Sequence, residues 1–490
     1  MKNKRHPCFV LRWLLLCAVA VSLVGTVPLF AQQTTSGTTG TTSGATTDSN
    51  ATQTSLTEFE ANRPGGGVFV NANGTMSRYT ARDFDAAVSR LQQAAARASY
   101  RLPSDITARS PMRCVSLNRL EKNIANADGT ITDEMLYLAG LQRITHVFYL
   151  SESKDIVIAG PAEGWFPGYE EMMIGVTTEQ PVLELRHLIT ALRAYAPGGE
   201  GGNIVGCSID PTPEGSIRLQ QFQDRFNSTR GGSNQDFIRG VRESIGMQTI
   251  RVDGIPATTH AAQMMVAADY RMKRIALGAD PAPIRQLKTF INNTVPNVSN
   301  AVFRWYFTPD YDSVILTEDR TGMQLVGNGV KLVGENELLF EGGERVVLPG
   351  GTLDRGSREF TQSFTQLYSQ IARRALVFAQ LRNWIDMLIC AAHIQREDFY
   401  GKSGWSMEFF GNEEKYQLET SVAPREVEPV VGARIVNRRL VAPVGGGIVI
   451  DAELALSEEH AKVDTDNKIA GQQKQIALDI PEGVWWWDVR

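Results

Sequence analysis

One long helical pattern constrains the fold of this chain more than any other feature. Between residues 359 and 395, apolar side chains recur every three or four positions and form one stripe along a helix. The stripe consists of Phe360, Phe364, Leu367, Ile371, Leu376, Phe378, Leu381, Ile385, Leu388 and Ala392. An unbroken helix of this length would exceed about 50 Å. We therefore expect a break near Arg373 and Arg374, which gives two long packed helices.

The second half of this pattern is apolar enough to resemble a membrane segment. Arg382 and Asp386, however, lie four residues apart at its centre, and two charges there would be costly in lipid. We interpret this segment as a core helix of a globular protein.

Strand patterns lie on both sides of the long helix. Residues 67–79 form two alternating runs around Asn73 and Gly74, a pair that strongly favours a β-hairpin turn. A second hairpin is expected at 145–150 and 155–159, and four or five strands at 302–340 predict an antiparallel block. Helices are expected at 81–99, 117–125, 133–141 and 181–195. Together these patterns predict an α+β fold: a mixed sheet with packed helices, the antiparallel strand block, the two long helices and a β-rich C-terminal segment.

The chain divides by composition into five segments. Basic residues, an apolar run at 13–24 and a small residue at Ala31 are typical of a cleaved signal peptide, with an uncleaved anchor as the alternative. The next segment is rich in Thr, Ser and Gly, which predicts a flexible spacer or, alternatively, a sugar-bearing stalk. The predicted segments are a signal peptide at 1–31, a spacer at 32–60, an α+β module at 61–230, a central module at 231–425 with the antiparallel strands and long helices, and a β-rich segment at 426–490.

The C-terminal segment has β-rich runs at 434–441, 448–456 and 475–480. It ends in three consecutive tryptophans, Trp485, Trp486 and Trp487. These residues either anchor the end of the chain in a strand or loop, or form an exposed aromatic platform for a sugar or a partner.

The spacing of cysteines and histidines limits which disulfide bridges and metal sites can be predicted. Beyond the signal peptide, the odd set Cys114, Cys207 and Cys390 provides no disulfide framework. We expect buried thiols, with one bridge between Cys114 and Cys207 as the alternative in an oxidising compartment. No two histidines lie four residues apart and no paired-cysteine motif occurs, so we predict neither a metal site nor a cofactor.

Two strand-to-helix turns are the best candidate binding sites, because free backbone N–H groups at a helix start favour an anion. In the first, Asp210 and Thr212 follow a strand at 203–209 and precede a helix that begins at Pro213. The alternative is that both side chains only shape the turn and cap the helix.

The second turn joins a strand at 248–254 to a helix at 259–277 and contains Asp253, Thr259 and His260. His260 would serve as a base, Asp253 as its orienting carboxylate and the helix start as an anion site. The alternative is a turn residue, a cap and an ordinary histidine of the first helical turn.

Charge argues against nucleic acid as the main partner. The net charge is −5, and it becomes −9 without the four basic residues of the signal peptide, Lys2, Lys4, Arg5 and Arg12. The sequence lacks a clustered Lys/Arg run, whereas nucleic-acid binding requires a concentration of positive charge. We also expect no transmembrane segment after residue 31.

Three stretches together resemble an uncharacterised domain-of-unknown-function family of planctomycete proteins, over residues 65–400. They are GCSIDPTPEG at 206–215, ADYRMKRIALG at 268–278 and FAQLRNWIDMLICAAHIQ at 378–395. The resemblance implies export in a bacterium with an elaborate envelope. It implies no activity and no catalytic residue.

Two function classes follow from these observations. The first is a non-catalytic binding or scaffolding protein of the periplasm or cell envelope, exported or extracellular, with an envelope protein or a glycan as the expected partner. The second is a secreted hydrolase with its site at a strand-to-helix turn. The first is preferred because the sequence contains none of the catalytic motifs considered, although catalytic groups meet in space rather than in sequence. Whether the protein is an enzyme stays open at this point.

Overall fold

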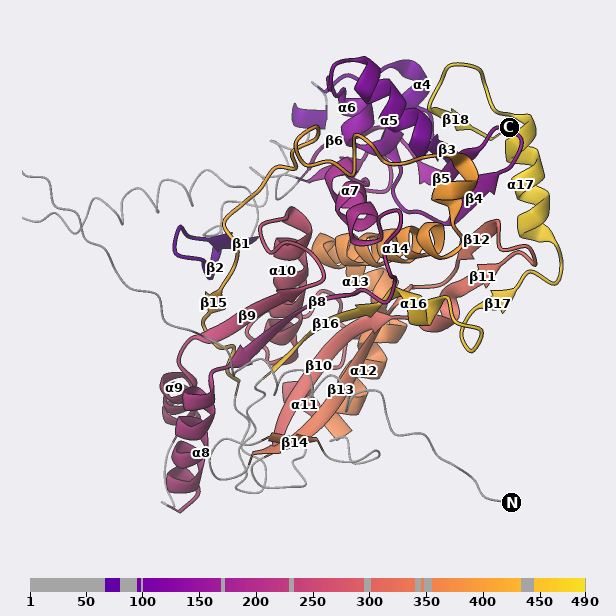
Figure 1. Cartoon of the computed structure of the whole chain (residues 1–490). Coiled ribbons are helices and arrows are strands. Elements are labelled where there is room, and N and C mark those ends of the chain that lie inside the picture. Colours follow the sequence, from indigo (N-terminus) through magenta and orange to yellow (C-terminus); the bar gives the residue numbers. More distant parts are fainter. Residues whose placement is uncertain are drawn as a thin grey trace, which may run out of the picture. The chain divides into compact units, whose positions relative to one another are not determined.

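The computed structural model of the chain describes residues 67–79, 95–97, 100–168, 172–228, 233–294, 301–339, 345–347, 355–432 and 445–489 (Figure 1). Among these residues there are two large β-sheets and a two-stranded one, with helices packed against them. The predicted α+β fold is confirmed. The expected signal peptide, the spacer, most of the helix at 81–99 and the strand at 434–441 lie outside the described residues.

The larger sheet has nine strands. In spatial order they are β1 (Gly67–Val70), β2 (Thr75–Tyr79), β15 (Glu426–Val427), β9 (Gln248–Asp253), β8 (Ile204–Pro211), β16 (Gly445–Asp451), β10 (Ala301–Pro309), β13 (Val330–Leu339) and β14 (Arg345–Val347). The hairpin predicted around Asn73 and Gly74 is confirmed as β1 and β2, and Gly74 has the positive φ of +84° that its turn requires. Strands β15 and β2, and β10 and β16, pair in parallel, whereas the other pairs are antiparallel. The sheet is therefore mixed, as predicted.

Glycines allow β16 to lie between β8 and β10. A Cβ atom at Gly446 would lie 2.1 Å from the carbonyl oxygen of Trp305, and one at Gly447 would lie 2.0 Å from that of Cys207. Both distances are far below van der Waals contact, so a side chain at either position would force the strands apart.

The second sheet has seven strands, and its inner strands β4 and β5 are buried on both faces. In spatial order they are β17 (Lys462–Val463), β11 (Val314–Leu316), β12 (Gly322–Leu325), β4 (His146–Leu150), β5 (Asp155–Ala162), β3 (Ser110–Ser116) and β18 (Trp486–Asp488). Along β4, Val147 and Tyr149 join the main core, whereas Phe148 and Leu150 join a second cluster beneath α17 (Lys468–Leu478). The alternation of side chains along a strand thus supplies both cores. The smallest sheet pairs β6 (Trp165–Pro167) with β7 (Met173–Gly175).

The structure corrects three expectations about strands. The antiparallel strands expected as one block at 302–340 divide between the two sheets, with β10 and β13 in one and β11 and β12 in the other. The run at 475–480 is not a strand, because Ile469 and Ile476, seven residues apart, place it in helix α17 against the second sheet. The strand expected at 448–456 ends at Asp451, where α16 (Ala452–Ala455) begins. Strands from the predicted segments 61–230, 231–425 and 426–490 share both large sheets.

The long helical stripe is broken as predicted. It forms α12 (Arg355–Gln366), α13 (Tyr368–Arg374) and α14 (Leu376–Arg396), with the predicted break at Ala375 and a second one at Leu367. Within the described residues, no helix combines the length and apolar character needed to cross a bilayer.

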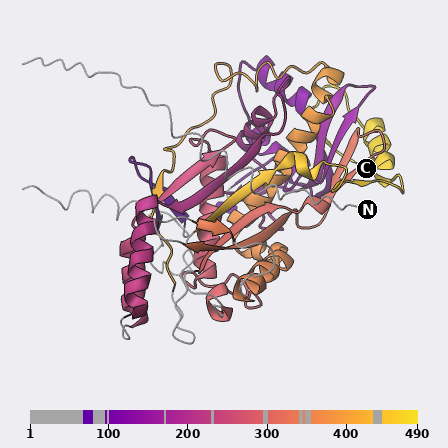
Figure 2. The same ribbon diagram turned by 60° about the horizontal axis from the view of Figure 1, so that its bottom comes forward.

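The remaining helices are α4 (Ser104–Thr107), α5 (Leu117–Asn126), α6 (Asp133–Leu136), α7 (Leu185–Ala194), α8 (Pro213–Ser228), α9 (Asn234–Ile245), α10 (His260–Ala276), α11 (Phe290–Asn293) and α15 (Phe399–Ser403), with short 3₁₀ turns at Leu138–Gly140 and Tyr311–Ser313. Helix α10 packs on β8 and β16, and α14 packs on α10 and α7. Helices α8 and α9 extend beyond the larger sheet in both views (Figures 1 and 2) and have a small core of their own around Leu219, Phe237 and Val241.

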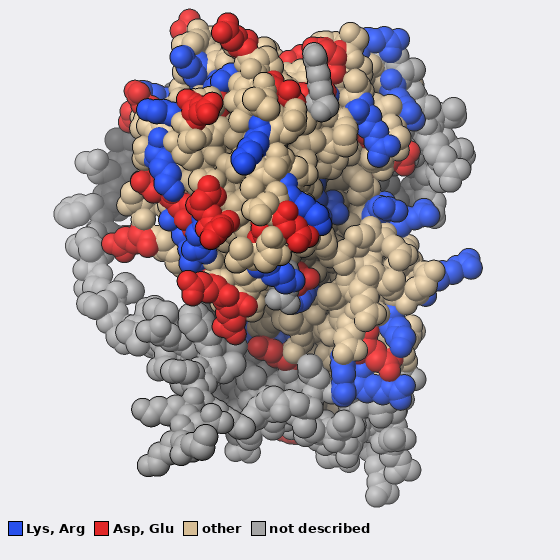
Figure 3. All heavy atoms as spheres, turned by 90° about the vertical axis from the view of Figure 1, so that its right-hand side faces the viewer, with Lys and Arg blue, Asp and Glu red and all other residues tan. Residues whose placement is uncertain are grey.

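The cysteines are buried and free. Cys114 lies on β3 of the smaller sheet and Cys207 on β8 of the larger one, so the alternative of a bridge between them is wrong. At the C-terminus, Trp486 and Trp487 form β18, which pairs with β3 and anchors the chain end. On the face drawn in Figure 3, acidic and basic side chains are interspersed.

Candidate metal centre

Two helix starts meet where α7 packs against α10 and α14. Glu184 immediately precedes α7 and His187 lies in its first turn. Residues three apart share one face of a helix, so the carboxylate and the imidazole lie together. On the other side, the hydroxyl of Thr259 accepts a hydrogen bond from the N–H of Ala262 and caps α10. His260 is therefore the first residue of that helix and reaches the same point.

The three side chains form a compact cluster. Nε2 of His187 and Nδ1 of His260 are 2.7 Å apart and share a hydrogen bond, with the two rings stacked 5.0 Å apart. One potential ligand atom from each of Glu184, His187 and His260 lies within 4.8 Å of the other two. The ring of Trp384 on α14 lies edge-on to that of His187, with the ring centroids 6.3 Å apart. His187 is buried, whereas Glu184 and His260 keep a small exposed surface.

Burial and neighbouring charges set the protonation of this cluster. Burial lowers the pKa of His187 to about 4 and the pKa of His260 to about 3. Burial alone would raise the pKa of Glu184, but its interactions with His187 and Arg186 hold it below its usual value. At neutral pH the cluster therefore presents two neutral imidazoles and one carboxylate, the forms that bind metal ions.

Two further charged side chains border the cluster. Nε of Arg186 donates to Glu184 at 2.5 Å, and the same guanidinium lies 3.4 Å from the exposed carboxylate of Glu419. The segment that contains Glu419 is held beside α10, because the N–H of Ser421 donates to the carbonyl of Thr258 at 2.9 Å. The cluster thus has a buried side and a polar, solvent-facing side.

The sequence-predicted site residues divide between this cluster and structural roles. His260 belongs to the cluster, but its hydrogen-bond partner is His187 rather than Asp253. The Asp253 carboxylate lies 3.4 Å from Arg251 at the end of β9. Asp210 pairs with Arg304 at 2.8 Å. Thr212 accepts a hydrogen bond from the N–H of Gly215 in the first turn of α8.

Glu184 and His187 were not predicted from the sequence. Their three-residue spacing is the only local signal, and nothing in the sequence connects them to a histidine 73 residues further on. We predicted no metal site from histidine spacing, but the fold assembles a possible donor set from two separate helices.

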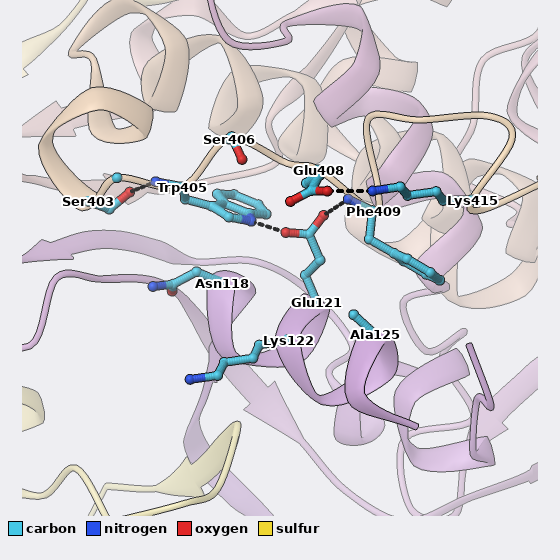
Figure 4. A pocket seen from close by; sticks show the side chains of 11 residues that line it. Asn118, Glu121, Lys122, Ala125, Ser403, Trp405, Ser406, Glu408, Phe409 and Lys415 are labelled. Carbon is cyan, nitrogen blue, oxygen red and sulfur yellow. Dashed lines mark hydrogen bonds and ion pairs between the residues drawn. The ribbon is translucent and has the colours of Figure 1, made fainter. Parts of the chain in front are cut away.

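A second candidate site is a cavity of about 550 Å³ between α5 and the segment 403–415 (Figure 4). Figure 4 shows Glu121 directed toward Trp405 and Phe409, whereas Lys122 on the same helix points away from them. The buried Glu121 carboxylate accepts hydrogen bonds from the indole N–H of Trp405 and from the backbone N–H groups of Phe409 and Phe410. Its oxygens thereby hold the segment in place, so this cavity has no free buried acid for catalysis.

Comparison with known proteins gives a family without an assigned activity. Residues 207–290 match a family described as a protein of unknown function (DUF1598). No curated protein and no solved structure matches the chain. The matched region contains His260 but neither Glu184 nor His187. It also contains most of the first stretch and all of the second stretch that carry the resemblance described above, whereas the stretch at 378–395 lies outside it. The planctomycete affiliation stays a prediction.

Proposed function

We propose that this is an exported protein that binds a divalent metal ion through Glu184, His187 and His260. Zinc is the ion that we expect. The observation that carries the proposal is the convergence of two neutral imidazoles and one carboxylate from two helices. Two His and one Glu form a common zinc donor set, and three protein ligands leave a coordination position for water or another ligand.

Metal binding would exchange one interaction for another. Two nitrogens bound to one zinc ion lie about 3.3 Å apart, whereas those of His187 and His260 lie 2.7 Å apart. The rings would separate by about 0.6 Å, and the imidazole that donates the shared hydrogen bond would move its proton to its other nitrogen. Since both rings are neutral well below pH 7, proton competition would be weaker than for an exposed histidine.

Calorimetric titration of chelator-treated protein with zinc chloride tests the proposal. We expect one zinc ion per chain, with binding at least tenfold weaker after His260→Ala and after Glu184→Gln. Glu184→Gln keeps the size of the side chain and so separates loss of a ligand from loss of packing. His460→Ala is the matched control, because His460 lies against Tyr311 and outside the cluster. Equal zinc affinity in all four proteins would reject the site.

Export is a separate part of the proposal and rests on the N-terminal sequence pattern alone. We propose that the protein acts in the periplasm, in the cell envelope or outside the cell, as a binding or scaffolding protein with an envelope protein or a glycan as partner. The intact mass of protein from its native host tests this. A chain that begins at Gln32 supports export, whereas one that retains residues 1–31 contradicts cleavage.

A metal-dependent hydrolase is the second candidate function. It is favoured by the open coordination position and by Glu419, whose exposed carboxylate borders the cluster through Arg186. A metal-bound water would be the nucleophile and Glu419 its general base. Hydrolysis of p-nitrophenyl acetate by the zinc-loaded protein, lost in Glu419→Gln while zinc binding persists, would support the hydrolase. Zinc binding without hydrolysis would favour the non-catalytic function.

A further inference from the structure

The two charges at the centre of α14 do not pair with each other. Asp386, almost fully buried, instead accepts hydrogen bonds from Arg143, at 2.7 Å from Nε to Oδ2 and 3.4 Å from Nη2 to Oδ1. Nη1 of Arg143 donates to the carbonyl of Gly327 at 2.8 Å. Both oxygens of Asp386 therefore already accept hydrogen bonds from Arg143.

Arg382 forms no ion pair of its own within the described part of the chain, although the charge of Asp386 also acts on it. Among the described residues, no hydrogen bond or ion pair reaches its guanidinium, and its Nε is buried without a partner. The buried Nε is unfavourable without an acceptor, because the hydrogen bond that it would make to water is lost and not replaced. Burial, together with the nearby charge of Arg143, lowers the pKa of Arg382.

Arg143 and the side-chain stem of Arg382 both lie beside Gly329. A Cβ atom added to Gly329, in the turn before β13, would lie 3.1 Å from Nη2 of Arg143, 3.1 Å from Oδ1 of Asp386 and 3.9 Å from Cγ of Arg382. Arg373 of α13 is exposed and also acts electrostatically on Arg382. Arg143, Arg373 and Asp386 thus act on Arg382 with two positive charges and one negative charge, and Arg382 itself adds to this excess of positive charge.

We propose that Arg382, supported by Arg143, binds an oxyanion of the phosphate or sulfate class. The planar guanidinium offers paired N–H donors that match two oxygens of such an anion, and a doubly charged anion would offset the positive excess. The site lies at the turn before β13 and is independent of the metal proposal.

Titration calorimetry of the full chain with sodium phosphate, and separately with sodium sulfate, tests this inference. Potassium chloride at matched ionic strength is the reference, because general screening would respond to any salt. We expect saturable heats with phosphate or sulfate and none with chloride. Heats that match those of chloride would overturn the proposal.

Three variants make the test specific. Arg382→Met keeps an apolar stem without the donors, so anion binding should weaken at least tenfold. Arg382→Lys keeps the charge but loses the paired donors, so its binding should lie between those of the Met variant and the unchanged protein. Arg242→Met, at an exposed position of α9, is the matched control and should bind like the unchanged protein. Equal affinity in the Arg382 variants and the control would overturn the assignment.

Thermal unfolding without added anion gives an independent measurement. If Arg382 lacks a partner, Arg382→Met should unfold at an equal or higher temperature than the unchanged protein, because an uncompensated charge is removed. A large decrease in its unfolding temperature would show that Arg382 already has a structural partner and would contradict the proposal.

Discussion

Replacement of His393 should flatten the pH dependence of stability. This side chain lies in α14 with no exposed surface, and its ring contacts Phe399. Burial, followed by the charges of Arg320, Arg396 and Lys402, lowers its pKa to about 3. The imidazole is therefore neutral in the folded protein at pH 5, whereas an unfolded chain protonates it below about pH 6.5.

The magnitude follows from this difference in protonation. At pH 8 both states bind almost no proton at this site, but at pH 5 the unfolded state binds about one more than the folded state. Stability therefore rises with pH across this range, and protonation at pH 5 stabilises the unfolded chain by about 2 kcal/mol. The value hardly depends on the folded pKa as long as that stays below about 4, because only the unfolded state is then protonated at pH 5.

Urea unfolding at pH 5 and pH 8, at constant ionic strength and with a chelator present, measures the effect. The free energy of unfolding should fall from pH 8 to pH 5 in the unchanged protein, and by about 2 kcal/mol less in His393→Leu. The drop in the unchanged protein also includes His146, His187 and His260, whose pKa values burial lowers in the same direction. These contributions remain in the variant and cancel in the comparison.

His393→Gln is the matched control, since glutamine is polar but does not titrate. Both variants should lose the same pH-dependent part, while differences in packing should shift their stability equally at both pH values. A drop in His393→Leu as large as in the unchanged protein would refute the argument that a neutral, buried His393 opposes acid unfolding.

Three further predictions concern buried groups. The thiols of Cys207 and Cys390 are buried, and burial raises their pKa values. A thiol reagent should therefore label the native protein far more slowly than the denatured one. Rapid labelling of Cys207 in the native protein would contradict this. Asp386→Asn should lower the free energy of urea unfolding by about 3–5 kcal/mol, because it leaves the buried charge of Arg143 without its partner. A change below about 1 kcal/mol would contradict this. Glu121→Gln should cost about 1.5–3 kcal/mol by the same measurement, since charge-assisted bonds from Trp405 and two backbone N–H groups are lost; an unchanged unfolding midpoint would show that these bonds contribute little.

Local patterns predicted many of the elements. The Asn73-Gly74 turn, the helix after Pro213 and the break at Ala375 each depend on the conformational preferences of a few adjacent residues. The strand predicted at 475–480 is wrong, because Ile469 and Ile476 are seven residues apart, a spacing that favours a helix. The packing of α17 on the second sheet buries both side chains.

The α+β class, the hairpins, the helix start at Pro213 and the position of His260 at a helix start could be predicted from the sequence, whereas the helices expected at 133–141 and 181–195 are shorter than predicted. Those features depend on interactions between residues near one another in the chain. Three features come from contacts that form only in the folded chain: His260 meets His187 and Glu184, Asp386 pairs with Arg143 rather than with Arg382, and strands from all three segments share two sheets. The physical reason is separation in the chain: His187 and His260 are 73 positions apart, and Arg143 and Asp386 are 243 positions apart. At such distances no local preference specifies the partner, and only the packing of whole helices and sheets selects it.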